Sequence, residues 1–205
     1  MTGRTHLVVG TAAAIAVVCP QTPAALCTCA AAGAVGSVIS DVDSQRSGSH
    51  KRLVKICIVL LLAVLVLAAV EQHWHLGISE WLMSQTSLNR ILPGGLAFLV
   101  VCWYGMNCPH RTFMHSLLAL VILTVLAWLM VPAFALPFAV AMISHIILDL
   151  LNRRKVRLFY PLKRGFSLNL CKSKGWVNNI LFAVGCLALV LEIGSFLMTP
   201  IYELI

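Results

Sequence analysis

Long apolar runs separated by short polar segments are the feature that most constrains this chain. The runs cover residues 53–70, 91–105, 117–131, 138–151 and 177–198. Apolar runs of roughly 17 to 25 residues cross a bilayer as helices, because a helix satisfies its own backbone polar groups. Only 11% of the 205 residues are charged, whereas soluble domains carry about 25%. We therefore expect an all-α, polytopic membrane bundle that forms a single domain over residues 1–205.

Two further segments, 6–19 and 24–39, are rich in alanine and glycine and are separated by Pro20 and Pro23. Small residues allow close helix packing in lipid, so we expect a tight helical hairpin of two helices that are short for a full span. With them the bundle has about seven helices. We also expect an amphipathic or irregular segment over 71–90 and a tight turn over 132–137.

Positive charge is unevenly distributed along the chain. Segment 152–174 is strongly basic, and the polar segment 40–52 and its surroundings carry Arg46, Lys51, Arg52 and Lys55. Tracing the spans places both segments on one side of the membrane together with Arg4 and Arg111. Arg90 is the basic residue on the other side. Lys and Arg gather in cytoplasmic loops, so this side is expected to be the cytoplasm. This distribution accounts for the net charge of +8 and makes nucleic acid an unlikely partner.

The stretch from Pro109 to Ser116 places two histidines and an arginine between apolar runs. The same tracing brings all three aspartates and four of the seven histidines to that one face. Ionisable residues at membrane depth are costly and indicate function. The predicted metal ligands are His6, Asp41, Asp43, His110, His115, His145 and Asp149.

The residue types in this group indicate the chemistry. Imidazole and carboxylate without a thiolate cluster fit a catalytic site of two or three divalent cations better than a structural zinc site. His145 and Asp149 stand four apart, which places both on one helix face. Taken singly, each residue has an ordinary explanation as a cap, an interfacial residue or a partner of Arg153. Their convergence favours a shared site, with zinc expected and manganese or iron as alternatives.

The order of these residues is also familiar. It runs through Thr5-His6, Ser40 to Asp43, His110 to Ser116, Ser144 to Asp149 and Tyr160-Pro161. This order resembles the YdjM-like, LexA-regulated family of bacterial inner-membrane metal-dependent hydrolases. Ser40 stands where that family usually has proline, and Met114 stands where it usually has threonine. The resemblance implies the bacterial cytoplasmic (inner) membrane, a link to the SOS response, and a distant similarity to the helical fold of zinc-dependent phospholipase C and P1 nuclease.

The expected function is metal-assisted hydrolysis of a phosphoester in a lipid or lipid-linked substrate at the cytoplasmic face. Asp43 could act as a general base instead of a ligand, and the planar guanidinium of Arg111 suits a phosphoryl group. The basic segment from Arg153 to Lys174 would hold an anionic lipid headgroup. The alternatives are a nuclease or nucleotide phosphatase with the same metals, and a metal transporter or stress-response membrane protein without catalysis. A transporter should hold its ligands near the bilayer midplane, whereas these gather at one face.

Overall fold

The computed structural model describes residues 1–43, 62, 65–66, 68–173 and 175–202. Within these residues the chain is helical apart from loops and two isolated β-bridges, so the all-α membrane bundle predicted from the sequence is confirmed. The elements are α1 (Gly3–Val18), α2 (Pro23–Ile39), the 3-10 turn η1 (Ser40–Asp43), α4 (Ile78–Gln85), α5 (Leu88–Asn107), the 3-10 turn η2 (Phe113–His115), α6 (Leu117–Met130), α7 (Pro132–Leu150) and α8 (Trp176–Tyr202).

Four helices of the described part are long and apolar enough to cross a membrane. They are Pro23–Asp43, Leu88–Asn107, Pro132–Leu150 and Trp176–Met198. Helices α1 and α6 are apolar but shorter. The predicted span 53–70 lies mostly outside the described residues, and so do His50 and the basic positions 46–55.

The predicted helical hairpin is confirmed by the packing of α1 against α2. A Cβ at Gly33 would lie 3.0 Å from the Cβ of Ala14, so the two backbones approach as closely as small residues permit. Helix α7 packs closely against the same hairpin. A Cβ at Gly36 in α2 would overlap the carbonyl group of Phe138 in α7. These contacts hold together α1 and α7, which carry His6, His145 and Asp149, and α2, which leads into η1.

The prediction of a tight turn over residues 132–137 is wrong. Val131 alone separates α6 from α7, and Pro132 is the first residue of α7. Proline suits that position because the first N–H groups of a helix have no intrahelical partner. Pro137 lies buried inside the same helix, where it removes only one hydrogen bond near the helix start.

Segment 71–90 is more regular than the sequence predicted. Residues 71–74 and α4 are helical. His75 and Gly77 adopt positive φ angles of 48° and 70° between them. The carboxylate of Glu71 accepts a hydrogen bond of 2.7 Å from the backbone N–H of Ile78, which satisfies one free donor at the start of α4. Helix α5 begins at Leu88 instead of Ile91.

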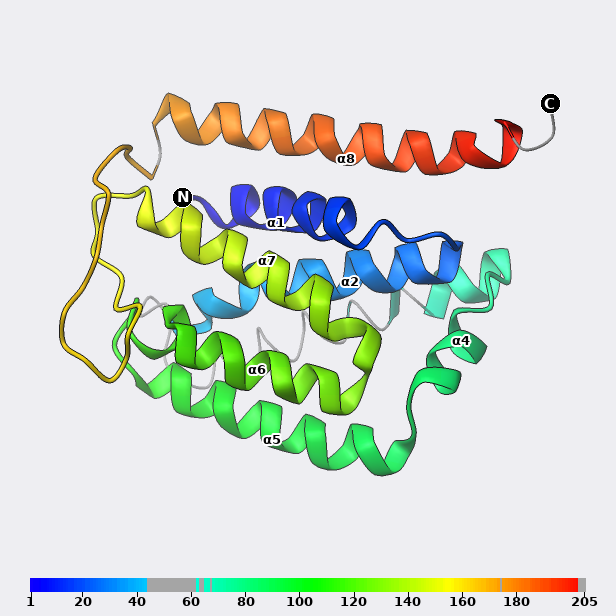
Figure 1. Ribbon diagram of the computed structural model, residues 1–205, viewed down its shortest axis with the longest axis horizontal. Helices are drawn as coiled ribbons and strands as arrows, with labels where there is room; N and C mark the ends of the chain where they lie inside the picture. The colour runs from blue at the N-terminus through cyan, green and yellow to red at the C-terminus, as the bar shows by residue number, and fades with distance from the viewer. Residues whose placement is uncertain (44–61, 63–64, 67, 174, 203–205) are drawn as a thin grey trace.

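A hydrophobic core of α5, α6 and α7 lies beside the candidate site. Its largest fully buried side chains are Met114, Leu123 and Met142. Met114 belongs to η2, next to His115, so it packs the site loop against the bundle. The start of α1, the end of α2, the α5–α6 loop, the end of α7 and the start of α8 all lie at one end of the bundle (Figure 1).

Candidate metal centre

All seven predicted ligands lie at this one end of the bundle, although they come from four separate segments. His6 belongs to the beginning of α1, and Asp41 and Asp43 belong to η1. His110 and His115 lie in and after the loop that follows α5. The last two predicted ligands, His145 and Asp149, lie in the final turns of α7, and both are buried. Antiparallel helices thus bring distant residues to a common depth.

Five of these residues form what we call the central cluster: His6, Asp41, His115, His145 and Asp149. The Nε2 atoms of His6 and His115 each lie 3.4 Å from a carboxylate oxygen of Asp149. The Nε2 atoms of His145 and His115 lie 3.7 and 3.9 Å from Oδ1 of Asp41. Three imidazoles therefore turn the same nitrogen toward two carboxylates.

The central cluster is closed on most sides. The side chains of His6, His115, His145 and Asp149 are at most 2% exposed, whereas that of Asp41 is 38% exposed. Asp41 therefore lies on the side from which solvent or a substrate reaches the cluster. The rings of His6 and His145 stack, with centroids 3.9 Å apart.

The donor set of the central cluster fits a divalent cation. Nδ1 of His6, both ring nitrogens of His115 and Nε2 of His145 are buried without a hydrogen-bond partner. Buried polar atoms without partners are rare and destabilising, and coordination to a metal would satisfy Nε2 of His115 and Nε2 of His145, which face the carboxylates of the cluster. Two triads of ligand atoms lie within 4.8 Å of one another, one of His6, His145 and Asp149 and one of Asp41, His115 and His145. Imidazole and carboxylate are ligands that zinc, iron and manganese accept.

Backbone and carboxylate groups around the cluster orient its rings. Nδ1 of His145 lies 2.6 Å from the carbonyl oxygen of Ser37, which accepts its hydrogen. This bond leaves Nε2 of His145 as the free nitrogen on the cluster side, the arrangement by which proteins orient metal-binding imidazoles. Asp43 lies on the other side of His115, with Oδ2 3.4 Å from its Nδ1.

Arg111 holds the site loop and one of the carboxylates. Its Nη2 atom lies 2.9 Å from Oδ2 of Asp149, and its Nη1 donates to the carbonyl oxygen of Arg154. The backbone of Arg111 has a positive φ of 65° and is held by bonds from its N–H to Asp43 and from the N–H of Arg157 to its carbonyl oxygen. The guanidinium therefore offsets the buried charge of Asp149, and only its Nε is buried without a partner.

The electrostatics of His115 follow from its neighbours. Burial opposes the charged imidazolium, but the carboxylates of Asp149 and Asp43 outweigh this effect and raise the pKa of His115 to about 9. A ring that holds a proton so strongly lies in a negative environment, which also attracts a cation. A metal bound at this cluster would therefore compete with the proton for His115.

A match to a family model shows which family this chain belongs to. The profile of the YdjM inner membrane protein family matches residues 1–202. The chain belongs to this family. Membership confirms the resemblance seen in the sequence and, with the four candidate spans, identifies an inner-membrane protein. Neither the curated proteins nor the solved structures contain a match.

One polar residue of this YdjM family member escaped the analysis of its sequence. Asn178 is buried near the start of α8, and its side-chain oxygen accepts bonds of 2.9 Å from the N–H of Thr2 and the hydroxyl of Thr5. Thr5 directly precedes His6, so Asn178 ties α8 to the start of α1. The sequence feature that could have identified Asn178 is an amide side chain at the beginning of a long apolar run.

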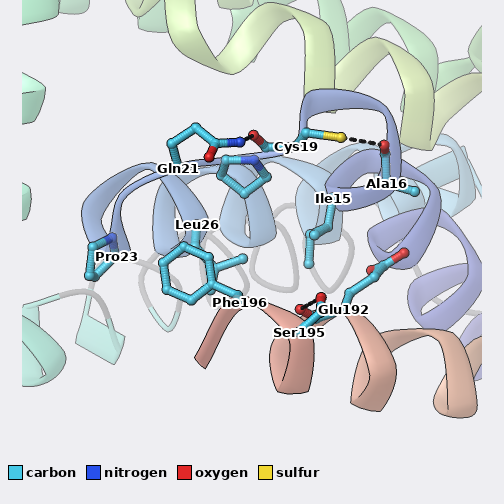
Figure 2. Close-up of a pocket in the computed structure, with 10 residues that line it drawn as sticks. Ile15, Ala16, Cys19, Gln21, Pro23, Leu26, Glu192, Ser195 and Phe196 are labelled. Carbon is cyan, nitrogen blue, oxygen red and sulfur yellow. Dashed lines mark hydrogen bonds between the residues drawn. The ribbon is translucent and has the colours of Figure 1, made fainter. Parts of the chain in front are cut away.

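Two features lie at the other end of this YdjM bundle. His73 and His75, which the sequence assigned to the opposite interface, precede α4 in the chain. Helix α4 lies at the end of the bundle opposite the N-terminus (Figure 1). A cavity of about 400 Å³ lies between the α1–α2 connection and α8, lined by Ile15, Leu26, Glu192 and Phe196 among others (Figure 2). It is therefore separate from the central cluster.

Proposed function

We propose that this YdjM family member is a metal-dependent hydrolase that cleaves a phosphoester in a lipid or lipid-linked substrate. The observation that carries the proposal is the central cluster, in which three buried imidazoles and two carboxylates converge while buried ring nitrogens lack partners. These five residues would hold the metal, with zinc as the first expectation. A divalent cation bound there would activate a water and offset negative charge on a phosphoryl oxygen.

The residues around the cluster would position the substrate. Asp41 marks the exposed side, so the phosphoryl group would enter there. Arg111 lies 2.9 Å from Asp149, and its planar guanidinium could share its hydrogen-bond donors between that carboxylate and a phosphoryl oxygen. Phe113 and Met114 are buried beside His115 in η2 and would keep bulk water from this side of the site.

The loop between α7 and α8 supports a membrane lipid as the source of the phosphoester. It carries basic residues and exposes large apolar side chains, including those of Phe159, Leu162, Leu168 and Leu170. It joins the ends of two candidate spans, so it lies at the bilayer surface. Basic residues there attract anionic headgroups, and the exposed leucines suit the headgroup boundary. We propose that this surface faces the cytoplasm, because Lys and Arg gather on that side.

Metal analysis combined with a lipid hydrolysis assay tests this proposal. The purified protein should contain zinc, manganese or iron by elemental analysis and should release headgroups or phosphate from one member of a phospholipid panel. His115→Ala and Asp149→Ala should reduce both the metal content and the activity, whereas His73→Ala, at the other end of the bundle, should change neither. Unchanged metal content and activity in the two site variants would exclude the proposed centre.

A nuclease or nucleotide phosphatase is the second candidate, favoured by the same basic loop. DNA binding in detergent that weakens steeply with salt would support it, whereas a released lipid headgroup would oppose it. A metal transporter is less compatible with the fold, because the ligands lie at one end of the bundle and not at its middle. Metal flux into proteoliposomes that is lost in His145→Ala would support transport.

A further inference from the structure

Asp43 and His110 form the shortest contact between two side chains among the predicted ligands. Oδ1 of Asp43 lies 2.6 Å from Nδ1 of His110. The other oxygen, Oδ2, accepts the backbone N–H of Arg111 at 3.1 Å. Asp43 is fully buried, whereas the side chain of His110 is 26% exposed. A carboxylate beneath the surface thus holds one nitrogen of a partly exposed imidazole.

His110 differs from the three histidines of the central cluster in the carboxylate that its ring faces and in the ring nitrogen that faces it. Those rings direct Nε2 toward Asp41 or Asp149, at 3.4 to 3.9 Å. Within the part of the chain that the structure describes, Asp43 is the one carboxylate within 4.0 Å of the His110 ring, and it lies against Nδ1. The ring nevertheless stays close to the cluster, with its centroid 5.3 Å from that of His115 and the two planes at 89°.

We propose that Asp43 and His110 are a proton-transfer pair beside the metal centre and not members of its ligand shell. The inference rests on the proposed hydrolase function. Asp43 is a positioning residue: it accepts the Nδ1 hydrogen of His110 and leaves the lone pair of Nε2 free. His110 is the catalytic residue that contacts the attacking water. A buried carboxylate that fixes the tautomer of a more exposed imidazole is the arrangement that general-base catalysis requires.

The proton balance of the step is complete. The attacking water gives one proton to Nε2 of His110 while its oxygen forms a bond to phosphorus. The bond between phosphorus and the leaving oxygen breaks, and its electron pair stays on that oxygen. The leaving oxygen then takes the proton from Nε2, so one water is consumed and His110 returns to its starting form.

Counting metal ions separates this proposal from the alternative that His110 is a ligand. Atoms of Asp43, His110 and His115 also lie within 4.8 Å of one another and could hold an ion of their own. His110→Gln should contain as much metal per chain as the wild type, whereas His145→Gln should lose metal. The loss of one equivalent from His110→Gln would make His110 a ligand and overturn the proposal.

Kinetics of the same variants test the proton transfer, with bis(p-nitrophenyl) phosphate as the probe. His110→Gln should lower kcat about 10²- to 10⁴-fold, and added imidazole should restore part of the activity of His110→Gly. His73→Gln is the matched control and should behave as the wild type. Full metal content together with an unchanged kcat in His110→Gln would exclude the catalytic role. A wild-type protein that binds metal but cleaves neither this probe nor phospholipids would instead refute the hydrolase function itself.

Discussion

Nε2 of His6 lies 3.4 Å from Oδ1 of Asp149. His6 belongs to the first turn of α1 and Asp149 to the last turn of α7. The pair depends on the close packing of α1, α2 and α7, which glycines make possible. Any change that separates these helices should therefore open the candidate metal centre without touching a ligand.

Gly36→Ala tests that dependence. The new methyl group would overlap the carbonyl group of Phe138 in α7, so the helices must shift apart. We expect a loss of about 1–3 kcal/mol of stability and a weaker affinity for metal, measured by thermal unfolding in detergent and by metal titration. Gly194→Ala is the control, because a Cβ there meets nothing within 4 Å. Equal behaviour of the two variants would mean that the α2–α7 contact does not support the site.

Removal of Arg111 should destabilise the protein prepared without metal. Asp149 is 2% exposed, and Arg111 lies 2.9 Å from it, whereas the N-terminal amine of Met1 lies 3.3 Å away. A buried charge that loses every partner costs about 3–5 kcal/mol, and the amine offsets part of that cost, so Arg111→Ala should unfold at a moderately lower denaturant concentration than the wild type. Added zinc should reduce the difference, because a cation at Asp149 would replace the guanidinium. A difference that zinc leaves unchanged would place the ion away from Asp149.

Metal affinity should rise with pH between about 6 and 9. The pKa of His115 is raised to about 9 by Asp149 and Asp43, against the effect of burial. Below that pH the ring carries a proton that a metal must displace, so each unit of decrease in pH should weaken binding up to about tenfold. Isothermal titration at several pH values would measure both the affinity and the protons released. An affinity that is constant across this range would contradict the assignment of His115 as a ligand.

Asn178→Leu should loosen α8 from α1. The substitution removes the acceptor for the N–H of Thr2 and the hydroxyl of Thr5 and leaves both donors without it. We expect a loss of about 1–3 kcal/mol, seen as a lower unfolding temperature and faster proteolysis near residue 175. Asn179→Leu, at the exposed neighbouring position, should be much milder.

At two prolines and in one polar segment, the structure differs from what local sequence signals predict. Pro132 and Pro137 look like a turn in the sequence, yet both lie in α7. The first position of a helix needs no N–H donor, which suits Pro132, whereas Pro137 removes one hydrogen bond that the packing of α7 outweighs. Residues 71–90 carry no long apolar run, but α4 and the start of α5 are helical there. Local signals compete with tertiary packing at such boundaries, and packing decides.

The sequence by itself determined the membrane bundle and the residues of the candidate site. Apolar runs of spanning length admit few structures in lipid, since each backbone polar group must be satisfied within the helix. The same constraint makes every buried histidine and aspartate conspicuous, and an alternating chain direction brings His6, Asp43, His115 and Asp149 to one end. The order of these residues also carried the family, which the match over residues 1–202 confirms.

Only the tertiary structure showed that the seven predicted ligands form two groups. His6, Asp41, His115, His145 and Asp149 converge through Nε2 and carboxylate atoms, whereas Asp43 holds His110 through Nδ1. The rotation of each ring depends on partners such as the carbonyl oxygen of Ser37, which no residue spacing reveals. Spacing along a chain places residues at a depth in the membrane, but hydrogen bonds between helices determine which atom each residue presents.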